Sequence, residues 1–491
     1  MSTFNVKIKW NKETYDLELD TNEPPSVFKA QIFALTGVTT DRQKVMFKGG
    51  VIKDDEWNST MLKSIKNGAT FLMMGTADEL PVEPQQKNVF IEDMTEKELA
   101  EVLDQPSGLI NLGNTCYLNA TIQSLSTVPE MKECLKKYKG SLTLNESFDG
   151  AHDIVVSLRD VYNKMETSST VMPVLLLEML HIMFPQFSEK TENGQLAQQD
   201  ANECWSELIK VLQQKLKIEP IGGDAATNSR NFITQYFGGT LQATMKCIED
   251  ESEEPTVSNE NFLQLSCFIS QDVKYLQTGL RLRLEEEINK YSTKLDRDAR
   301  YLKTSKISRL PAYLSINLIR FFYKEKNAIN AKILKDVKFS LTLDMYELCT
   351  PELQKKLVPM RQKYKDHEDQ KVEKMQQQKS KTSEKPDVES GEKKDYYNYS
   401  FEDDSGSSNT GLYQLYAVLT HKGRSSSSGH YVGWIKHKGK WFKCDDDQVY
   451  QVSDEEILKL SGGGDWHCAY VLLYGPQLIE KCETLQPTSG Q

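Results

Sequence analysis

The feature that most constrains the fold is a change of hydrophobic period near the start of the chain. Apolar and polar residues alternate over 4–10 and again over 15–19, a pattern typical of a half-buried β-hairpin. The pattern becomes helical between Pro25 and Gly37, where four apolar residues share one face: Val27, Phe28, Ile32 and Leu35. Two further short strands are expected at 44–47 and 70–74. Two strands, a helix and two strands in this order predict a small α+β domain.

This first segment resembles a ubiquitin-like β-grasp domain over residues 1–76. The stretch DRQKVMFKGG at 41–50 stands where ubiquitin has its Gln-Arg-Leu-Ile-Phe stretch, and the spacing of the elements also matches. The segment ends with Gly75-Thr76 and lacks a terminal Gly-Gly, so it is not expected to be conjugated as ubiquitin is. We interpret it as a docking module; the alternative is another small α+β domain unrelated to ubiquitin.

Length, charge and cysteine usage narrow the class of protein. The 491 residues suffice for two or three domains with a large core. The net charge of -11 argues against a nucleic-acid-wrapping surface, and no apolar run suits a membrane span or a secretory signal. The nine cysteines are odd in number and irregularly spaced, which favours a reducing, intracellular compartment over a disulfide framework. Because no two form a Cys-x-x-Cys pair, we expect no structural zinc and no cofactor.

Polar segments divide the rest of the chain. Residues 77–100 contain prolines and are expected to be a linker, and the main domain is expected over 101–477. Within it, 363–409 is rich in Lys, Glu, Gln, Asp and Ser and buries too little apolar surface to offset its ordering entropy. We interpret 363–409 as a disordered insertion with some helix near its start, and 478–491 as a frayed tail.

A lone cysteine precedes a helix-like pattern in GLINLGNTCYLNATIQSL, residues 108–125. Apolar residues at helical spacing place the helix start close to Thr115, which is a fair N-cap after a tight Gly-Asn turn. Cys116 then lies in the first turn, where the N–H groups stabilise a thiolate and can also stabilise an oxyanion. The side-chain amide of Asn111 offers a further donor. This pattern predicts a nucleophile; the alternative is an inert core cysteine.

A nucleophilic cysteine needs a base, and His430 has the most informative surroundings. It begins a predicted strand that turns at 438–439 and returns toward three consecutive aspartates. With a two-residue turn, His430 faces Asp447, and Asp445 lies diagonally on the same side. A one-residue slip brings Asp446 there instead. A carboxylate would fix the imidazole's tautomer, but the pattern leaves open which one does so. The alternative is a solvated acidic turn beside a surface histidine.

Several segments in a fixed order resemble the ubiquitin-specific protease family. Residues 108–125 look like the family's cysteine box, and GHYVGWIKHKGKWFKCDDDQV at 429–449 looks like its histidine box. Other similar segments are QQDANECWSELI (198–209), LPAYLSINLIRFFY (310–323), VKFSLTLDM (337–345) and CAYVLLY (468–474). The resemblance implies a papain-like palm and thumb with a β-sheet fingers region. The N-terminal ubiquitin-like domain makes the chain most similar to the family's proteasome-associated members.

The resemblance implies a role for each matching residue. Cys116 matches the nucleophile, His430 the general base and Asp445 the acid that orients the histidine. Asn111 matches the oxyanion-hole amide. Residues around the Gln-Gln-Asp-Ala segment are implied to bind substrate, with carboxylates that meet the arginines of ubiquitin's tail: Gln199, Asp200 and Glu203.

The chain is therefore expected to be an α+β deubiquitinase with a ubiquitin-like domain before a papain-like catalytic domain. It should hydrolyse the bond after ubiquitin's C-terminal glycine in ubiquitin and polyubiquitin conjugates, through a thioester. The resemblance implies that residues 1–76 bind the regulatory particle of the 26S proteasome, in the cytoplasm and, with proteasomes, in the nucleus. The alternatives are a catalytically weak ubiquitin-binding scaffold and an enzyme for another ubiquitin-like modifier.

Two polar loops are expected to regulate access to the site. The first, at 424–429, directly precedes His430 and includes Ser425, Ser426, Ser427, Ser428 and Gly429. The second is at 323–332. The resemblance implies that two such loops cover the groove for ubiquitin's tail in the free enzyme, which would be slow until the proteasome opens them. The alternative is that both are ordinary surface loops.

Overall fold

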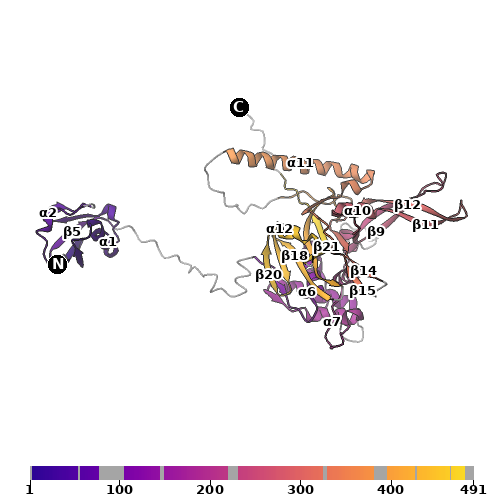
Figure 1. Ribbon diagram of the computed structural model, residues 1–491, viewed down its shortest axis with the longest axis horizontal. Coiled ribbons are helices and arrows are strands. Elements are labelled where there is room, and N and C mark those ends of the chain that lie inside the picture. The colour runs from indigo at the N-terminus through magenta and orange to yellow at the C-terminus, as the bar shows by residue number, and fades with distance from the viewer. Residues whose placement is uncertain are drawn as a thin grey trace, which may run out of the picture. The chain divides into compact units, whose positions relative to one another are not determined.

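The computed structural model describes residues 3–53, 56–76, 104–143, 149–218, 231–324, 329–380, 395–425, 428–464 and 466–481. These residues belong to two compact units, Met1–Phe90 and Ile91–Gln491 (Figure 1). The predicted linker at 77–100 and residues 482–491 of the predicted tail lie outside the described residues. A search of the described helices finds none with the length and apolar character that a membrane crossing requires.

The N-terminal unit has the predicted order of elements. Its helices are α1 (Pro25–Thr36) and α2 (Ser59–Leu62). Its strands are β1 (Thr3–Trp10), β2 (Glu13–Asp20), β3 (Lys44–Phe47), β4 (Gly50–Val51) and β5 (Thr70–Met74), in the sheet order β2-β1-β5-β3-β4. The central pair, β1 and β5, is parallel, and the other pairs are antiparallel. This is the arrangement expected of a β-grasp domain.

The buried face of α1 is narrower than predicted. Phe28 and Ile32 are buried against the sheet, but Val27 and Leu35 are 39% and 43% exposed. The helix ends as predicted at Gly37, whose φ of 67° is left-handed backbone that glycine adopts without steric cost. The predicted face of four apolar residues was therefore wider than the part of α1 that this small sheet covers.

A layer of helices in the second unit encloses the segment around Cys116. The first of these, α4 (Cys116–Leu125), has all ten residues buried. Around it lie α5 (Pro129–Lys137), α6 (Gly150–Met165), α7 (Val174–Met183), α8 (Ala201–Lys215) and α9 (Phe232–Phe237). Helix α4 contacts both α8 and the sheet strand β18 (Ser428–His437). The helix is therefore fixed on all sides, and so is the cysteine at its start.

The second layer is a mixed sheet that carries His430. Its strands follow the order β10 (Leu265–Phe268), β13 (Leu314–Ile319), β21 (Cys468–Pro476), β17 (Leu412–Ser425), β18, β19 (Lys440–Asp445) and β20 (Gln448–Val452), and β16 (Thr342–Asp344) pairs with β17. All nine residues of β21 are buried. Strand β18 contacts helix α4 of the first layer, and in the view of Figure 1 the labels of β18, β20 and β21 stand above those of α6 and α7. Cys116 and His430 therefore lie where the two layers meet, since α4 contacts β18.

A third group of strands forms the predicted fingers region. The strands β8 (Gly239–Cys247), β9 (Thr256–Phe262), β11 (Glu285–Ser292) and β12 (Arg297–Arg309) form a sheet in the order β11-β12-β8-β9. Figure 1 shows β9, β11 and β12 projecting from the body of the unit near α10 (Leu276–Arg283). The remaining short elements are β6 (Gly108–Leu109), β7 (Thr170–Val171), β14 (Phe321–Lys324), β15 (Ile329–Lys332) and α12 (Asp454–Leu458).

The predicted insertion at 363–409 has the helix expected near its start, but the disorder predicted for its other end is wrong. Helix α11 (Pro351–Ser380) contains residues 363–380 and is anchored near its start by the buried Leu353 and Leu357. At the other end, Asp404 pairs with Arg309 of the second unit at 2.8 Å, and the side chain of Asn409 donates to the backbone carbonyls of Asn398 and Ser400 within the segment. Polar side chains are satisfied there by local hydrogen bonds, which composition does not reveal. Residues 381–394 lie outside the described residues.

The predicted frayed tail also begins too early. Ile479 is buried, and the side chain of Lys481 pairs with Asp395 at 2.8 Å. The chain is therefore held through Lys481, because the polar segment at 395–409 provides the surface on which it packs.

Candidate active site

Cys116 is the first residue of α4, as predicted. The chain enters the helix through Gly113 and Asn114, which have positive φ angles of 101° and 54°. Thr115 occupies the predicted N-cap position, but its hydroxyl accepts from the N–H of Leu112 at 2.8 Å and does not cap the helix. Because no side chain caps α4, its first N–H groups are available to an oxyanion.

His430 joins Cys116 to a carboxylate. Its Nε2 lies 2.6 Å from Oδ1 of Asp445, and the ring also hydrogen-bonds the Cys116 thiol. These two contacts, with Asp445 the stronger, raise the pKa of His430 to about 10, although burial opposes the rise. His430 and then Lys443 hold the pKa of Asp445 well below its usual range. The site therefore holds an imidazolium beside the sulfur at neutral pH, as an activated cysteine nucleophile requires.

The turn geometry decides which aspartate meets His430. The two-residue turn at 438–439 forms as predicted, with left-handed backbone at both residues. Asp446 also has a positive φ, 55°, and starts a second tight turn into β20. Asp447 therefore leaves the strand before it can face His430. The diagonal residue Asp445, at the end of β19, is the one that meets the imidazole.

Asp446 ties the histidine hairpin to the cysteine segment. Its carboxylate accepts from the side chains of Asn111 at 2.8 Å and Asn119 at 2.9 Å. Its backbone carbonyl accepts from the N–H of Leu109 at 2.8 Å. These bonds hold two segments together that are far apart in the sequence, so the distance between Cys116 and His430 depends on them. The sequence pattern gave Asp446 only as an alternative orienting acid.

Asn111 links the turn before α4 to Asp446 through hydrogen bonds. Its Oδ1 accepts from the backbone N–H groups of Gly113 and Thr115, at 2.9 and 3.1 Å. Its Nδ2 donates to Asp446. An amide nitrogen carries two hydrogens, so the oxyanion role expected of Asn111 would fall to the second one. That role stays a prediction.

Gln198 is a donor at the sulfur that the sequence pattern did not single out. Its Nε2 lies 3.9 Å from Sγ of Cys116, and the backbone N–H of Tyr431 lies 3.5 Å from the same atom. The prediction named the neighbouring Gln199 as a substrate-binding residue. Two adjacent glutamines just before α8 have no period that would show which side chain faces the cysteine, so only the structure separates them.

The acidic residues expected to bind substrate differ in their surroundings. Asp200 caps α8 by accepting from the N–H groups of Asn202 and Glu203, and it accepts from the hydroxyl of Tyr470 at 2.8 Å. Burial raises the pKa of Asp200 despite these bonds. Glu203 is exposed and receives one weak contact, from Gln186 at 3.4 Å. Glu203 is thus the carboxylate with more capacity for a cationic ligand.

The two predicted loops are hairpin ends in the structure. Strands β17 and β18 run to Ser425 and Ser428, which pair with each other, so the loop is shorter than predicted. The predicted residues Ser426 and Ser427 lie outside the described residues. At 323–332 the strands β14 and β15 pair, and 325–328 lie outside the described residues. Polar residues, including a run of serines at 425–428, indicated loops, but the neighbouring strands extend their pairing into both segments.

One group among the described residues has the spacing of a metal site, namely His430, Asp445 and Asp446, whose ligand atoms lie within 4.8 Å of one another. Its donors are already used. Asp445 accepts from His430 and pairs with Lys443, and both oxygens of Asp446 accept from asparagines. The ligand atoms of these three residues are engaged in hydrogen bonds and an ion pair with protein side chains, so the group does not fit a metal ion.

The charge on His430 gives a pH-dependent prediction. Because its folded pKa is raised from 6.5 to about 10, the His430–Asp445 pair contributes stability that is complete below about 6.5 and is lost as the pH rises through about 10. NMR of ¹³Cε1-labelled histidine should show His430 protonated through pH 8.5, about 1.5 pH units below that folded pKa. In Asp445→Asn it should titrate nearer its ordinary value. Equal titration midpoints in the two proteins would contradict the assigned pair.

These features define a cysteine hydrolase: a thiol at a helix start, a histidine bonded to it and an aspartate that orients the histidine. The profile of the family described as "Ubiquitin carboxyl-terminal hydrolase" matches residues 107–474, and that of the "Ubiquitin family" matches 4–78. The chain belongs to the ubiquitin carboxyl-terminal hydrolase family. It is a cysteine-type deubiquitinase with an N-terminal ubiquitin-like domain, which confirms the predicted fold class and enzyme class.

Relatives match over almost the whole chain. "Ubiquitin carboxyl-terminal hydrolase 7" of Arabidopsis thaliana is 41% identical and covers 96% of this chain and 99% of its own. "Ubiquitin carboxyl-terminal hydrolase 14" of Caenorhabditis elegans is also 41% identical, with 98% and 95% covered. A solved structure, the "SAGA Ubp8/Sgf11/Sus1/Sgf73 DUB module bound to ubiquitin aldehyde", is 20% identical with a TM-score of 0.51 over 76% of this chain and 69% of that one. It supports the fold.

Proposed function

We propose that this deubiquitinase removes ubiquitin from conjugates at the proteasome, trims their chains and so recycles ubiquitin. The observation that carries the proposal is that a ubiquitin-like domain and the Cys116–His430–Asp445 site stand on one chain. The first can dock on a receptor for ubiquitin-like folds, and the second can cleave the bond that joins ubiquitin to a substrate. We propose that the enzyme acts in the cytoplasm, and in the nucleus where proteasomes are present, because a proteasome-bound enzyme would share the proteasome's location.

The proposed reaction has two halves, formation of a thioester on Cys116 and its hydrolysis by water, and His430 and Asp445 act in both. The Cys116 sulfur attacks the carbonyl carbon of ubiquitin's last glycine, and His430 gives its proton to the departing lysine amine. A thioester remains. Water then attacks the thioester, His430 takes a proton from that water, and the sulfur departs with the carboxylate of ubiquitin released. Asp445 keeps the imidazole oriented throughout, and the first N–H groups of α4 stabilise the oxyanion.

The tail of ubiquitin is proposed to enter between the helix layer and the sheet. Its arginines would meet Glu203 and Asp200 at the start of α8, since carboxylate–arginine hydrogen bonds are charge-assisted. Gln199 lies beside them and would contact the tail. Glu203 is the exposed member, so we expect it to contribute most to substrate affinity.

Hairpin ends beside His430 support a proposed gate. Gly429 has a φ of 133°, and a Cβ there would lie 2.6 Å from Nε2 of the buried His421. Burial lowers the pKa of His421 to about 3, so a neutral ring supports the hairpin. We propose that this hairpin end and that of β14–β15 cover the groove for ubiquitin's tail in the free enzyme. A partner that binds the open form more tightly would then activate it.

Deleting residues 1–76 tests the proteasome part of the proposal. The truncated enzyme should keep its slow basal hydrolysis of a fluorogenic ubiquitin amide, because the catalytic unit has its own cores. It should fail to co-purify with proteasomes. Added proteasomes should accelerate the full-length enzyme about tenfold or more but not the truncated one. Full activation of the truncated enzyme would show that docking lies elsewhere.

Replacing Gln198 tests the donor that the structure adds at the sulfur. We expect Gln198→Ala to lower kcat on the fluorogenic amide about a hundredfold, which is typical of a lost oxyanion donor, with little change in KM. Gln199→Ala is the matched control. It should leave kcat unchanged, and any effect it has should be on KM. Equal, small effects in both variants would show that Gln198 only packs beside the thiol.

A further inference from the structure

A hollow of about 850 Å³ lies between the ends of α5 and α8 and the start of α9. Helix α8 begins beside the active site at Ala201 and ends at the hollow with Lys215, and its fifteen residues span about 20 Å. The hollow is therefore separate from the Cys116 site. Its volume lies in the range of about 300–1,000 Å³ that binding pockets occupy.

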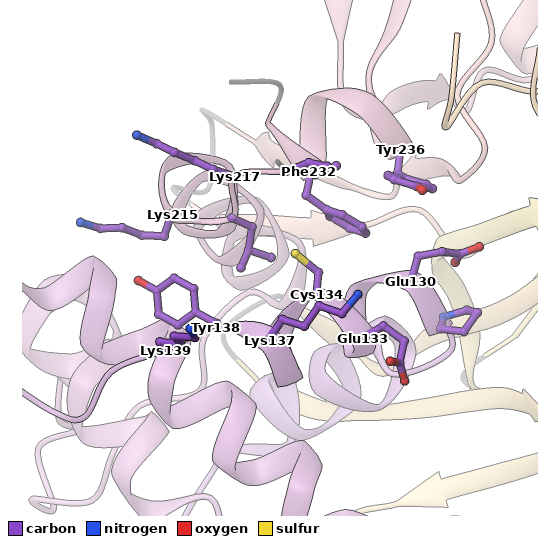
Figure 2. A pocket seen from close by; sticks show the side chains of 13 residues that line it. Glu130, Glu133, Cys134, Lys137, Tyr138, Lys139, Lys215, Lys217, Phe232 and Tyr236 are labelled. Carbon is purple, nitrogen blue, oxygen red and sulfur yellow. The ribbon is translucent and has the colours of Figure 1, made fainter. Parts of the chain in front are cut away.

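The floor of the hollow is apolar. Leu216 and Ile218 lie at the end of α8, and Phe232 stacks on Tyr236 with their ring centroids 4.6 Å apart. Figure 2 shows the sulfur of Cys134 and the ring of Phe232 in the middle of the view. Burial raises the pKa of the Cys134 thiol, so it is a neutral and weakly polar part of the floor. The floor therefore suits a bulky apolar group.

One side of the rim is basic. Four lysines line the hollow: Lys137, Lys139, Lys215 and Lys217. Lys137 and Lys215 close the last turns of α5 and α8, where a cation stabilises the helix dipole, but Lys139 and Lys217 lie beyond the helices and have no such role. Figure 2 shows Lys215 and Lys217 on one side of the hollow, with Glu130 and Glu133 on the other.

The carboxylates of the acidic side keep their charge but are engaged by neighbouring side chains. The Glu130 carboxylate accepts hydrogen bonds from the hydroxyls of Tyr313 and Tyr399, each at 2.5 Å. Glu133 lies 3.8 Å from Lys136. Lys215 pairs with Asp149 at 2.5 Å, so the remaining positive charge of the rim comes from Lys137, Lys139 and Lys217, in a chain whose net charge is -11. They are spread along the rim and do not converge on one point, so they fit charges distributed along an extended chain better than a single small anion.

We propose that this hollow binds an acidic peptide segment of a partner protein, through one bulky apolar side chain on the floor and carboxylates along the lysine rim. The apolar contact supplies affinity, and the lysines supply specificity and a strong dependence on salt. The proposal does not rest on the proposed function, because binding is measured without ubiquitin or catalysis.

Two fluorescein-labelled nonapeptides are the probes: four glutamates, a tryptophan and four serines, in this order and in the reverse order. Binding to the full-length protein is followed by fluorescence anisotropy. Occupancy of the hollow is followed by mass spectrometry of alkylated Cys134, because Cys134 is the one cysteine in the described part of the chain that is not buried. At least one probe should bind and slow alkylation of Cys134 about fivefold or more, as expected when a buried floor contact excludes the reagent.

Variants separate the rim from general charge effects. Replacing Lys137, Lys139 and Lys217 by glutamate should weaken binding about tenfold or more. The matched control replaces three exposed lysines on α11, namely Lys355, Lys356 and Lys365, which changes the net charge by the same amount. The control should bind as the unmodified protein does. Peptides with glutamine for glutamate, or serine for tryptophan, should not protect Cys134.

Three results would overturn the proposal. The first is that neither probe slows the alkylation of Cys134. The second is that the α11 control loses as much affinity as the rim variant, which would show non-specific charge attraction. Equal protection by the glutamine peptide would show a purely apolar pocket for another kind of ligand. The alkylation measurement uses the unmodified protein, so it decides the question even if a variant does not fold.

Discussion

Cys116→Ala should abolish hydrolysis of ubiquitin conjugates and leave ubiquitin binding nearly unchanged. The sulfur is the atom that His430 contacts, and removing it leaves the imidazole without a nucleophile to activate. Loss of the nucleophile in a cooperative site costs about 10⁴-fold or more in kcat. The change is small and local, so the surfaces that hold ubiquitin persist. Turnover of a fluorogenic ubiquitin amide and calorimetric titration with ubiquitin measure the two quantities.

Cys134→Ala is the matched control for this substitution. It removes a cysteine of the same unit that lies in the hollow between α5 and α8, away from His430, and it should leave turnover unchanged. Residual turnover of Cys116→Ala within about tenfold of the unmodified enzyme would assign the nucleophile elsewhere.

Asp445→Asn should lower kcat by about 10³- to 10⁴-fold, the cost of losing the carboxylate that orients a catalytic histidine. The amide cannot hold a positive charge on the ring, so the pKa of His430 should fall and the imidazole should lose its fixed orientation. Asp447→Asn is the control and should act as the unmodified enzyme does, because the tight turn at Asp446 carries Asp447 out of the strand.

Asp446→Asn should lower kcat by less than Asp445→Asn does and by more than Asp447→Asn does. The Asp446 side chain accepts from Asn111 and Asn119, so its replacement loosens the contact between the cysteine segment and the histidine hairpin without touching the imidazole. Equal losses in the Asp445 and Asp447 variants would mean that the orienting carboxylate is shared or wrongly assigned.

The N-terminal domain could be predicted in detail because its signals are local. Alternation, the helical stretch and the Gly37 stop each depend on neighbouring residues, and β3 and β5 begin and end as expected. The exposure of Val27 and Leu35 could not be predicted in this way. It depends on how much of α1 the five-stranded sheet covers, which is a property of the tertiary packing.

The sequence predicted which types of residue form the candidate site, but not their arrangement in space. The helix start identifies Cys116, and the hairpin brings a carboxylate to His430. Which carboxylate depends on the positive φ of Asp446, which a run of three aspartates does not encode. The same limit applies to Gln198, since the irregular backbone before α8 has no period that distinguishes it from Gln199.

Composition misled the prediction most at 395–409. A polar sequence lacks apolar surface to bury, but α11 is anchored by two leucines near its start, and 395–409 satisfies its polar groups with one another and with the catalytic unit. Hydrogen-bond satisfaction of this kind involves residues far apart in the chain, such as Tyr399 and Glu130. Composition counts residues and does not include such pairs.

Reaction with ubiquitin carrying a C-terminal electrophile tests the central claim most directly. The account predicts one covalent ubiquitin per chain, mapped by mass spectrometry to Cys116, and formed far more slowly in Asp445→Asn. The Cys134→Ala protein should form the same adduct at the same rate. An adduct that forms with Cys116→Ala, or that maps to any other cysteine of the unmodified enzyme, would contradict the assignment of Cys116, His430 and Asp445 as the hydrolytic site.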